Sequence, residues 1–99
     1  MSYVISLLDK SPVATTAAEA LQTSIAFAKA AERLGYHRLW LAEHHGVPQL
    51  ASSAPEILAA HLLAVTKRIR IGTGGVLLQH YSPYKVAEVF GTLAALAPG

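Results

Sequence analysis

The sequence predicts an α/β fold, the first three βα units of a (β/α)8 TIM barrel with a parallel sheet. Short apolar segments rich in strand-forming residues alternate three times with longer segments of helical periodicity. The predicted strands start at Tyr3, Arg38 and Ile69, roughly 31 to 35 residues apart, which suits right-handed crossovers between parallel strands. A doubly wound open sheet uses the same pattern. An isolated three-stranded parallel sheet exposes two edges and one face, so we expect either a truncated barrel or association of copies.

The first unit begins with a strand over Tyr3–Leu8, YVISLL, followed by the turn-rich segment DKSPVA. Thr16 is followed three residues later by Glu19, which is the pattern of a capping box and predicts the start of a helix. Gly35 marks the end of this helix, because glycine readily adopts the left-handed conformation found after a helix. Helical spacing predicts an inward stripe of Leu21, Ile25, Ala28 and Ala31, with Lys29, Glu32 and Arg33 facing water.

The second strand, RLWLA, is expected over Arg38–Ala42, and the third, IRIGT, over Ile69–Thr73. Between them lie a loop over 43–52 and a second capping box, SAPE at Ser53–Glu56, with Pro55 tolerated in the first turn. The segment ILAAHLLAVT continues this second helix.

A third helix is expected after the loop GGVLLQHY. Ser82 is its predicted N-cap and Pro83 its first residue, a position where proline is well tolerated. Apolar residues recur along it at helical spacing, namely Val86, Val89, Phe90, Leu93 and Leu96. The sequence ends at LAALAPG, where a fourth strand is expected.

The composition indicates that some apolar faces are covered by a partner or by further sequence. The 99 residues are 53% hydrophobic and 14% charged, whereas a typical soluble domain has about 25% charged residues. The formal net charge is only +2. Its one basic cluster, Lys67, Arg68 and Arg70, has no interleaved aromatic residues for base stacking, so we expect no nucleic-acid partner.

Metal, disulfide and membrane functions are not expected. The chain has no cysteine, which excludes disulfides and thiolate metal sites. The adjacent His44 and His45 point to opposite faces of a strand and do not easily share one metal ion. The longest apolar tract, ILAAHLLAV, is interrupted by His61 and is far shorter than the ~20 residues of a membrane span. The N-terminus lacks the features of a signal peptide, so we expect a cytoplasmic protein.

Ionisable residues and glycines follow the predicted strands directly. Asp9, the run Glu43, His44 and His45, and the pair Gly74–Gly75 lie at strand ends. Because barrel function gathers at the carboxyl ends of the strands, these segments are expected to meet there. Other interpretations remain open at this point. Glu43 alone could cap a loop or pair with Arg38 or Lys85, His45 could be a surface residue, and GTGG could be only a flexible turn.

The sequence resembles a known family in GYHRLWLAEHHG and in LAAHLLAVTKRIRIGTGGVLLQHYSPYKVAEVFGTLAALAPG. These segments are similar to the N-terminal part of the bacterial luciferase-like, flavin-dependent monooxygenases, and are closest to the subgroup of unassigned substrate. The likeness covers nearly the whole chain. Family chains are roughly three times as long and fold as βα barrels, so the resemblance implies that residues 1–99 are the N-terminal portion of such a domain.

The resemblance also implies roles for individual residues. His44 matches the catalytic histidine beside the flavin, a general base whose imidazole titrates near working pH. Glu43 and His45 match its neighbours, which orient it or contribute to the subunit interface. Gly74–Gly75 matches a non-proline cis peptide beneath the flavin ring, and Thr73 is placed to hydrogen-bond nearby. The flavin phosphate site is implied to lie beyond Gly99.

The resemblance further implies that the helices expected after Ser53 and after Ser82 form a dimer interface. Small residues on them permit close approach of helices, and these are Ala59, Ala60, Ala64 and Val89. Packing of the same residues against the barrel explains them about equally well.

Three functions follow as hypotheses. The first is an FMN-dependent monooxygenase, in which reduced FMN from a flavin reductase reacts with dioxygen to oxygenate a small organic substrate. The second is a catalytically inert, self-associating fragment or a flavin-binding module. The third is a deazaflavin-dependent oxidoreductase, although AEHH at the second strand end looks more like the FMN branch.

Overall fold

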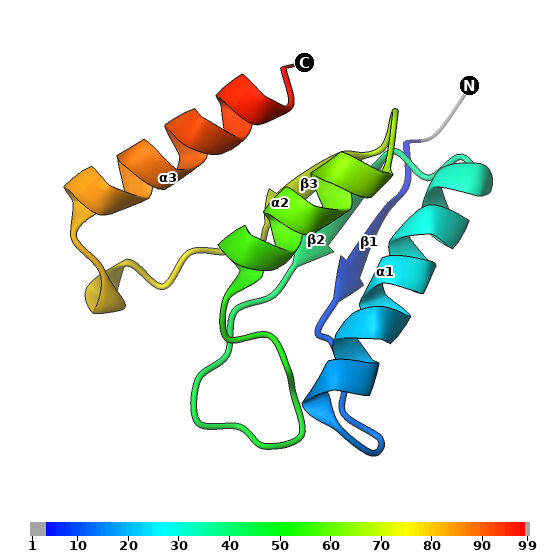
Figure 1. The fold of residues 1–99 in the computed structure, drawn as a ribbon, viewed down its shortest axis with the longest axis horizontal. Coiled ribbons are helices and arrows are strands. Elements are labelled where there is room, and N and C mark those ends of the chain that lie inside the picture. Colours follow the sequence, from blue (N-terminus) through cyan, green and yellow to red (C-terminus); the bar gives the residue numbers. More distant parts are fainter. Residues whose placement is uncertain (1–3, 99) are drawn as a thin grey trace.

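The computed structural model describes residues 4–98, so the Tyr3 start of the first predicted strand lies outside the described residues. The model confirms the predicted fold class. Three parallel strands form one sheet in the order β1-β2-β3, each followed by a helix (Figure 1). The elements are β1 Ser6–Asp9, α1 Ala17–Arg33, β2 Arg38–Leu41, α2 Pro55–Val65, β3 Arg70–Thr73, the short 3-10 helix η1 Leu78–His80 and α3 Pro83–Leu96.

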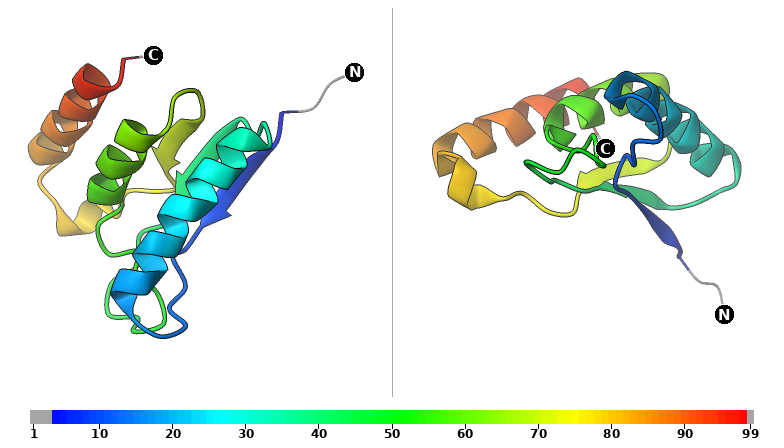
Figure 2. Two further views of the ribbon diagram at one scale, coloured as in Figure 1. Left: turned by 45° about the vertical axis from the view of Figure 1, so that its right-hand side comes forward. Right: turned by 90° about the horizontal axis from the view of Figure 1, so that it is seen from below.

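The helices cover one face of the sheet and leave the other face bare, as the view along the sheet shows (Figure 2). Leu39 and Leu41 of β2 are buried against the helices, in a core that also contains Ala28, Ala31, Ala59, Leu62 and Ile69. The alternate residues of β2 face the other way. There the guanidinium carbon of Arg38 lies 4.8 Å from the centre of the Trp40 ring. The sheet therefore has one apolar side and one side of mixed polarity.

The helix α1 begins and ends as the sequence predicts. The Thr16 side chain accepts a hydrogen bond of 3.1 Å from the backbone N–H of Glu19, and Gly35 follows the helix with a φ of +85°. In a capping box the glutamate side chain also accepts from the backbone N–H of the N-cap residue. Here the Glu19 carboxylate accepts instead from the hydroxyl of Thr15. The buried residues of α1 are Ala20, Ser24, Ala28 and Ala31, while Leu21 and Ile25 are half-buried.

Glu32 does not simply face water, which corrects the prediction for that residue. Its Oε2 atom accepts three backbone N–H bonds, of 2.8, 2.6 and 3.0 Å, from residues 67–69. These donors lower the pKa of Glu32 to about 2. Lys29 and Arg33 are exposed as predicted. Glu32 thus joins the end of α1 to the turn before β3, a contact between distant segments that helical periodicity does not reveal.

The start of α2 is another correction. The predicted cap Ser53 lies outside the helix, and the N-cap is Ala54, which offers no side-chain bond. Pro55 is the first helical residue, and a residue before proline is disfavoured in the helical conformation. If Ser53 were the N-cap, Ala54 would have to be the first residue with helical backbone angles. Pro55 disfavours those angles at Ala54, so the helix begins one residue later. In α3 the prediction is confirmed, because the Ser82 hydroxyl accepts from the backbone N–H of Lys85 at 3.5 Å and Pro83 comes first.

The helix α3 lies beside α2 and apart from the sheet (Figures 1 and 2). None of its residues is buried in the described structure. Val86, Val89, Phe90 and Leu93 are half-buried, and Leu96 is 71% exposed. The predicted apolar stripe is therefore present but only partly covered.

Candidate functional site

The carboxyl ends of the three strands lie side by side. Asp9 pairs in register with Leu41, and Leu41 with Thr73. The ladder continues one step further, because the N–H of Ala42 donates to the carbonyl of Asp9 at 3.1 Å and that of Gly74 to the carbonyl of Leu41 at 2.8 Å. The segments that follow β2 and β3 therefore leave from the same end of the sheet, as the sequence predicts. We call this end, formed by the carboxyl ends of the three strands, the carboxyl edge.

Glu43 is a buried carboxylate with three donors. It is 5% exposed. Its Oε2 accepts from the hydroxyl of Tyr81 at 2.5 Å and from Nε2 of His45 at 2.7 Å, and its Oε1 accepts from the N–H of Leu77 at 3.4 Å. Burial acts to raise the pKa of Glu43, but the hydrogen bonds from Tyr81 and His45 outweigh it and hold the pKa below the ordinary value. Glu43 therefore pairs with neither Arg38 nor Lys85.

His45 and Tyr81 surround this carboxylate. The His45 side chain is 35% exposed, and its ring meets the ring of His80 edge-on, with centroids 4.8 Å apart. The Tyr81 hydroxyl lies 3.4 Å from Nε2 of His45. The hydrogen bond to Glu43 raises the pKa of Tyr81 to about 12, so the phenol stays protonated and donates at neutral pH.

His44 has a separate partner. Its Nδ1 lies 3.2 Å from the Ser52 hydroxyl, and its backbone N–H donates to the Ser52 carbonyl at 2.9 Å. Ser52 is buried and the imidazole of His44 is half-buried. Successive side chains of an extended segment point to opposite sides, which separates His44 from its two neighbours. The ring is thus oriented by Ser52, and the side chains of Glu43 and His45 bind each other.

The peptide bond between Gly74 and Gly75 is cis, at the position where the resemblance implies one. Both glycines are exposed. A Cβ atom on Gly75 would meet no atom within 4 Å, and one on Gly74 would lie 3.5 Å from Cβ of Trp40. Thr73 is half-buried at the end of β3. This edge therefore presents bare peptide backbone against which a flat ring can lie.

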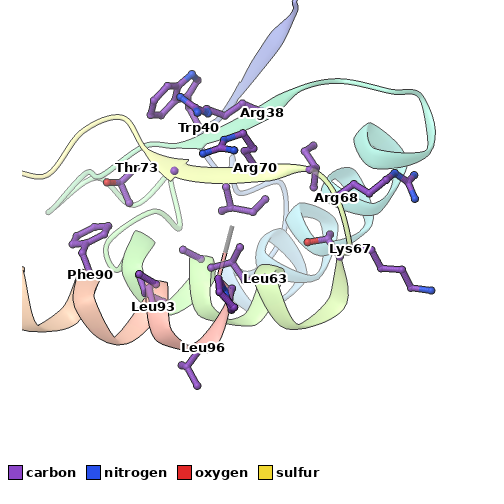
Figure 3. Close-up of a pocket in the computed structure, with 18 residues that line it drawn as sticks. Arg38, Trp40, Leu63, Lys67, Arg68, Arg70, Thr73, Phe90, Leu93 and Leu96 are labelled. Carbon is purple, nitrogen blue, oxygen red and sulfur yellow. The ribbon is translucent and has the colours of Figure 1, made fainter.

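A hollow of about 510 Å³ lies elsewhere, along the outer edge of β3 (Figure 3). Arg38, Trp40 and Arg70 line it from one side of the strand, and Leu63, Phe90 and Leu93 line it from the helical side. Among the predicted site residues, Thr73 lines it. An open strand edge beside apolar helix surface suits a further strand better than a small ligand. We therefore place the candidate site at the carboxyl edge and not in this hollow.

The sequence reasoning missed two residues of this edge, Ser52 and Tyr81. Each stands at the end of a loop, shortly before the helix that follows. That position is a usable signal, because a loop between a strand and its helix returns to the carboxyl edge before the helix begins.

Asp9 is also buried here. Its Oδ1 accepts from the N–H of Ser11 at 2.8 Å, and its Oδ2 has no partner among the described residues.

The chain belongs to the luciferase-like monooxygenase family, whose sequence model matches residues 1–99. It is 54% identical over 97 residues to the N-acetyl-S-alkylcysteine monooxygenase of Bacillus subtilis strain 168. The matched segment covers 96% of this chain and 29% of that relative. The chain therefore spans about 30% of the length of the relatives it matches.

Two solved structures share the fold of this chain. The crystal structure of apo-MsnO8 superposes with a TM-score of 0.93 at 54% identity, over 96% of this chain and 30% of that one. The second is the oxygenating constituent of 3,6-diketocamphane monooxygenase from Pseudomonas putida, in complex with FMN. It superposes with a TM-score of 0.91 at 24% identity, over 98% of this chain and 27% of that one, a likeness that concerns the fold.

No group of three His, Cys, Asp or Glu side chains in residues 4–98 is placed to hold a metal ion. Within the same residues, no helix has the length and apolar character needed to cross a membrane.

Proposed function

We propose that the chain forms the flavin-facing N-terminal part of an FMN-dependent monooxygenase that oxygenates a small organic substrate with dioxygen. One observation carries this proposal. The histidine His44 and the exposed Gly74–Gly75 peptide leave neighbouring strands at the same edge of the sheet. Membership of the luciferase-like monooxygenases supports the reaction class, and a neighbour of the same fold is a complex with FMN.

The described residues fit one face of the flavin ring. Gly75 has open space where a side chain would begin, so the backbone offers a flat, uncrowded surface. Thr73 directly precedes the Gly74–Gly75 peptide at the end of β3. FMN, when bound and reduced by a flavin reductase, supplies two electrons, with which one oxygen atom of dioxygen enters the substrate and the other leaves as water.

The role of His44 follows from how its ring is held. Ser52 binds Nδ1 and the backbone of His44 together, which fixes the direction of the imidazole. This leaves Nε2 as the nitrogen that accepts a proton during the reaction, and a neutral imidazole is a suitable base near pH 7. Glu43 and His45 act beside it as a hydrogen-bonded pair.

We also propose that copies associate through α2 and α3. The exposed face of α2 carries Ile57, which is 69% exposed, and α3 has no buried residue in the described structure and carries Leu96, which is 71% exposed. These surfaces favour a second candidate function, namely an inert self-associating fragment. Such a fragment would form ordered oligomers and take up no flavin.

FMN titration of the chain separates the two candidates. FMN fluorescence is measured as protein is added, and sedimentation velocity is run on the same samples. The flavoprotein proposal expects saturable binding that Gly75→Val weakens at least about tenfold, because its side chain fills the open space. Gly91→Ala is the matched control, since a Cβ atom there also meets nothing within 4 Å but lies on α3. An ordered oligomer without flavin uptake would establish the inert fragment.

A further inference from the structure

The loop between β3 and α3, residues 74–82, carries the Gly74–Gly75 peptide and leads away from the sheet to α3 (Figure 1). Gly74 is held by its bond to Leu41. Beyond it, three described hydrogen bonds tie the loop back to residues 43–45, which follow β2. Two of them end on Glu43, and the third joins the Tyr81 hydroxyl to Nε2 of His45 at 3.4 Å. The donors to Glu43 are the N–H of Leu77 and the hydroxyl of Tyr81.

Tyr81 joins two parts of the molecule. On one side it lines an apolar hollow of about 210 Å³ together with residues of the loop, α2 and α3, namely Glu56, Val76, Lys85, Val86, Val89 and Phe90. On the other side its hydroxyl reaches Glu43 at 2.5 Å. The residue therefore fixes the C-terminal end of the loop to the buried carboxylate at the carboxyl edge.

The bond is of a strong type. A carboxylate acceptor makes hydrogen bonds shorter and roughly twice as strong as neutral pairs, and Glu43 is almost fully buried. The charged or titratable groups around the bond are His45 on the β2–α2 loop, His80 on η1 and Glu56 on α2. Glu43 keeps His45 as a donor when the Tyr81 hydroxyl is removed, so this change loosens the loop without leaving a buried charge alone.

We propose that Tyr81 is a positioning residue, whose hydrogen bond to Glu43 holds the 74–82 loop so that the Gly74–Gly75 peptide is in place for the flavin. This inference rests on the proposed flavin site. Tyr81 acts through the loop backbone. Besides the bonds of the Tyr81 hydroxyl, residues 75–82 have one described hydrogen bond to residues 43–45, that of Leu77, and a ring contact between His80 and His45. Loss of the phenol hydroxyl therefore removes two of the three hydrogen bonds that tie the loop to this segment.

The first test measures amide hydrogen exchange in the wild-type chain, Tyr81→Phe and Glu43→Gln. Tyr84→Phe is the matched control, because Tyr84 is a nearby tyrosine that is 76% exposed. We expect amides of residues 75–82 to exchange roughly two- to tenfold faster in Tyr81→Phe, as the loss of the hydrogen bond to Glu43 predicts. Amides of β2 and the control should be unchanged. Unchanged loop exchange overturns the proposal, and faster exchange throughout the chain overturns it as well, because Tyr81 would then support the whole fold.

The second test measures FMN affinity of the same variants by fluorescence. We expect Tyr81→Phe to raise the FMN Kd roughly two- to tenfold, because only the fraction of molecules with an ordered loop binds. Saturating FMN should restore slow exchange of the loop. Faster loop exchange with an unchanged Kd separates the loop from the flavin and overturns the proposal. If the wild-type chain takes up no FMN, the proposed function fails, while the exchange measurement still decides whether Tyr81 holds the loop.

Discussion

The contact between Gly72 and Trp40 allows a quantitative prediction. The two residues are cross-strand partners on β3 and β2. A Cβ atom on Gly72 would lie 2.9 Å from Cζ3 and 3.1 Å from Cε3 of the Trp40 ring, well inside the 3.5–4.0 Å at which carbon atoms attract best. The ring is rigid and carries Arg38 over it at 4.8 Å, so it must move as a unit to accept a methyl group.

We expect Gly72→Ala to lower the free energy of unfolding by about 1–3 kcal/mol, the usual effect of overpacking. With a urea m-value of about 1–3 kcal/mol/M for a small protein, that corresponds to a midpoint lower by about 0.3–3 M. Trp40 is the one tryptophan in the sequence, so its fluorescence reports both the unfolding transition and the displacement of the ring. The emission maximum of the folded variant should shift relative to wild type.

Gly91→Ala serves as the control for this experiment. A Cβ atom at Gly91 meets nothing within 4 Å, and the residue lies inside α3. Alanine in a helix interior is favoured over glycine by roughly 0.5–1 kcal/mol, so this variant should be slightly more stable. If Gly72→Ala keeps the wild-type midpoint and the wild-type emission, the close approach of strand and ring does not restrict this position.

Three further outcomes are expected. The pKa of Glu32 is lowered from 4.5 to about 2 on folding, so its contribution to the free energy of unfolding is complete above pH 4.5 and is lost as the pH falls toward 2. Urea unfolding at several pH values should show the free energy of unfolding falling over this range, and Glu32→Gln should flatten that dependence. Leu62→Ala removes a fully buried side chain and should lower the free energy of unfolding by about 2–5 kcal/mol; a smaller loss would mean that the core around α2 closes over the cavity. His44→Ala should leave the FMN Kd within about twofold of wild type, whereas Gly75→Val should raise it at least about tenfold; equal effects in a fluorescence titration would contradict the separate roles proposed for the base and the ring surface.

The parts of the fold that depend on neighbouring residues could be predicted from the sequence. Apolar periodicity located the strands and helices, and the caps at Thr16 and Ser82 lie where their hydroxyl groups predict. The cap at Ser53 failed because proline two residues later restricts the residue between them, which is again a local effect.

Contacts between distant segments were the parts that could not be predicted. Glu32 binds backbone 35 to 37 residues further along, and Tyr81 reaches Glu43 across 38 residues. Neither residue has a local pattern that names its partner. The edge where the candidate site lies was predictable from the order of the strands, whereas the side chains that complete it became visible only with their positions in space.

The two outer strands of the sheet, β1 and β3, have a consequence for how copies of this molecule can join. Each copy contributes three parallel strands in the order β1-β2-β3, and head-to-tail addition of β3 to β1 would extend the sheet three strands at a time. Two copies supply six strands and three copies supply nine, so repetition of the unit never reaches the eight strands that close a (β/α)8 barrel. Association by this strand-edge pairing alone would end in a different ring size or remain an open ribbon, whereas association through α2 and α3 leaves both strand edges unpaired.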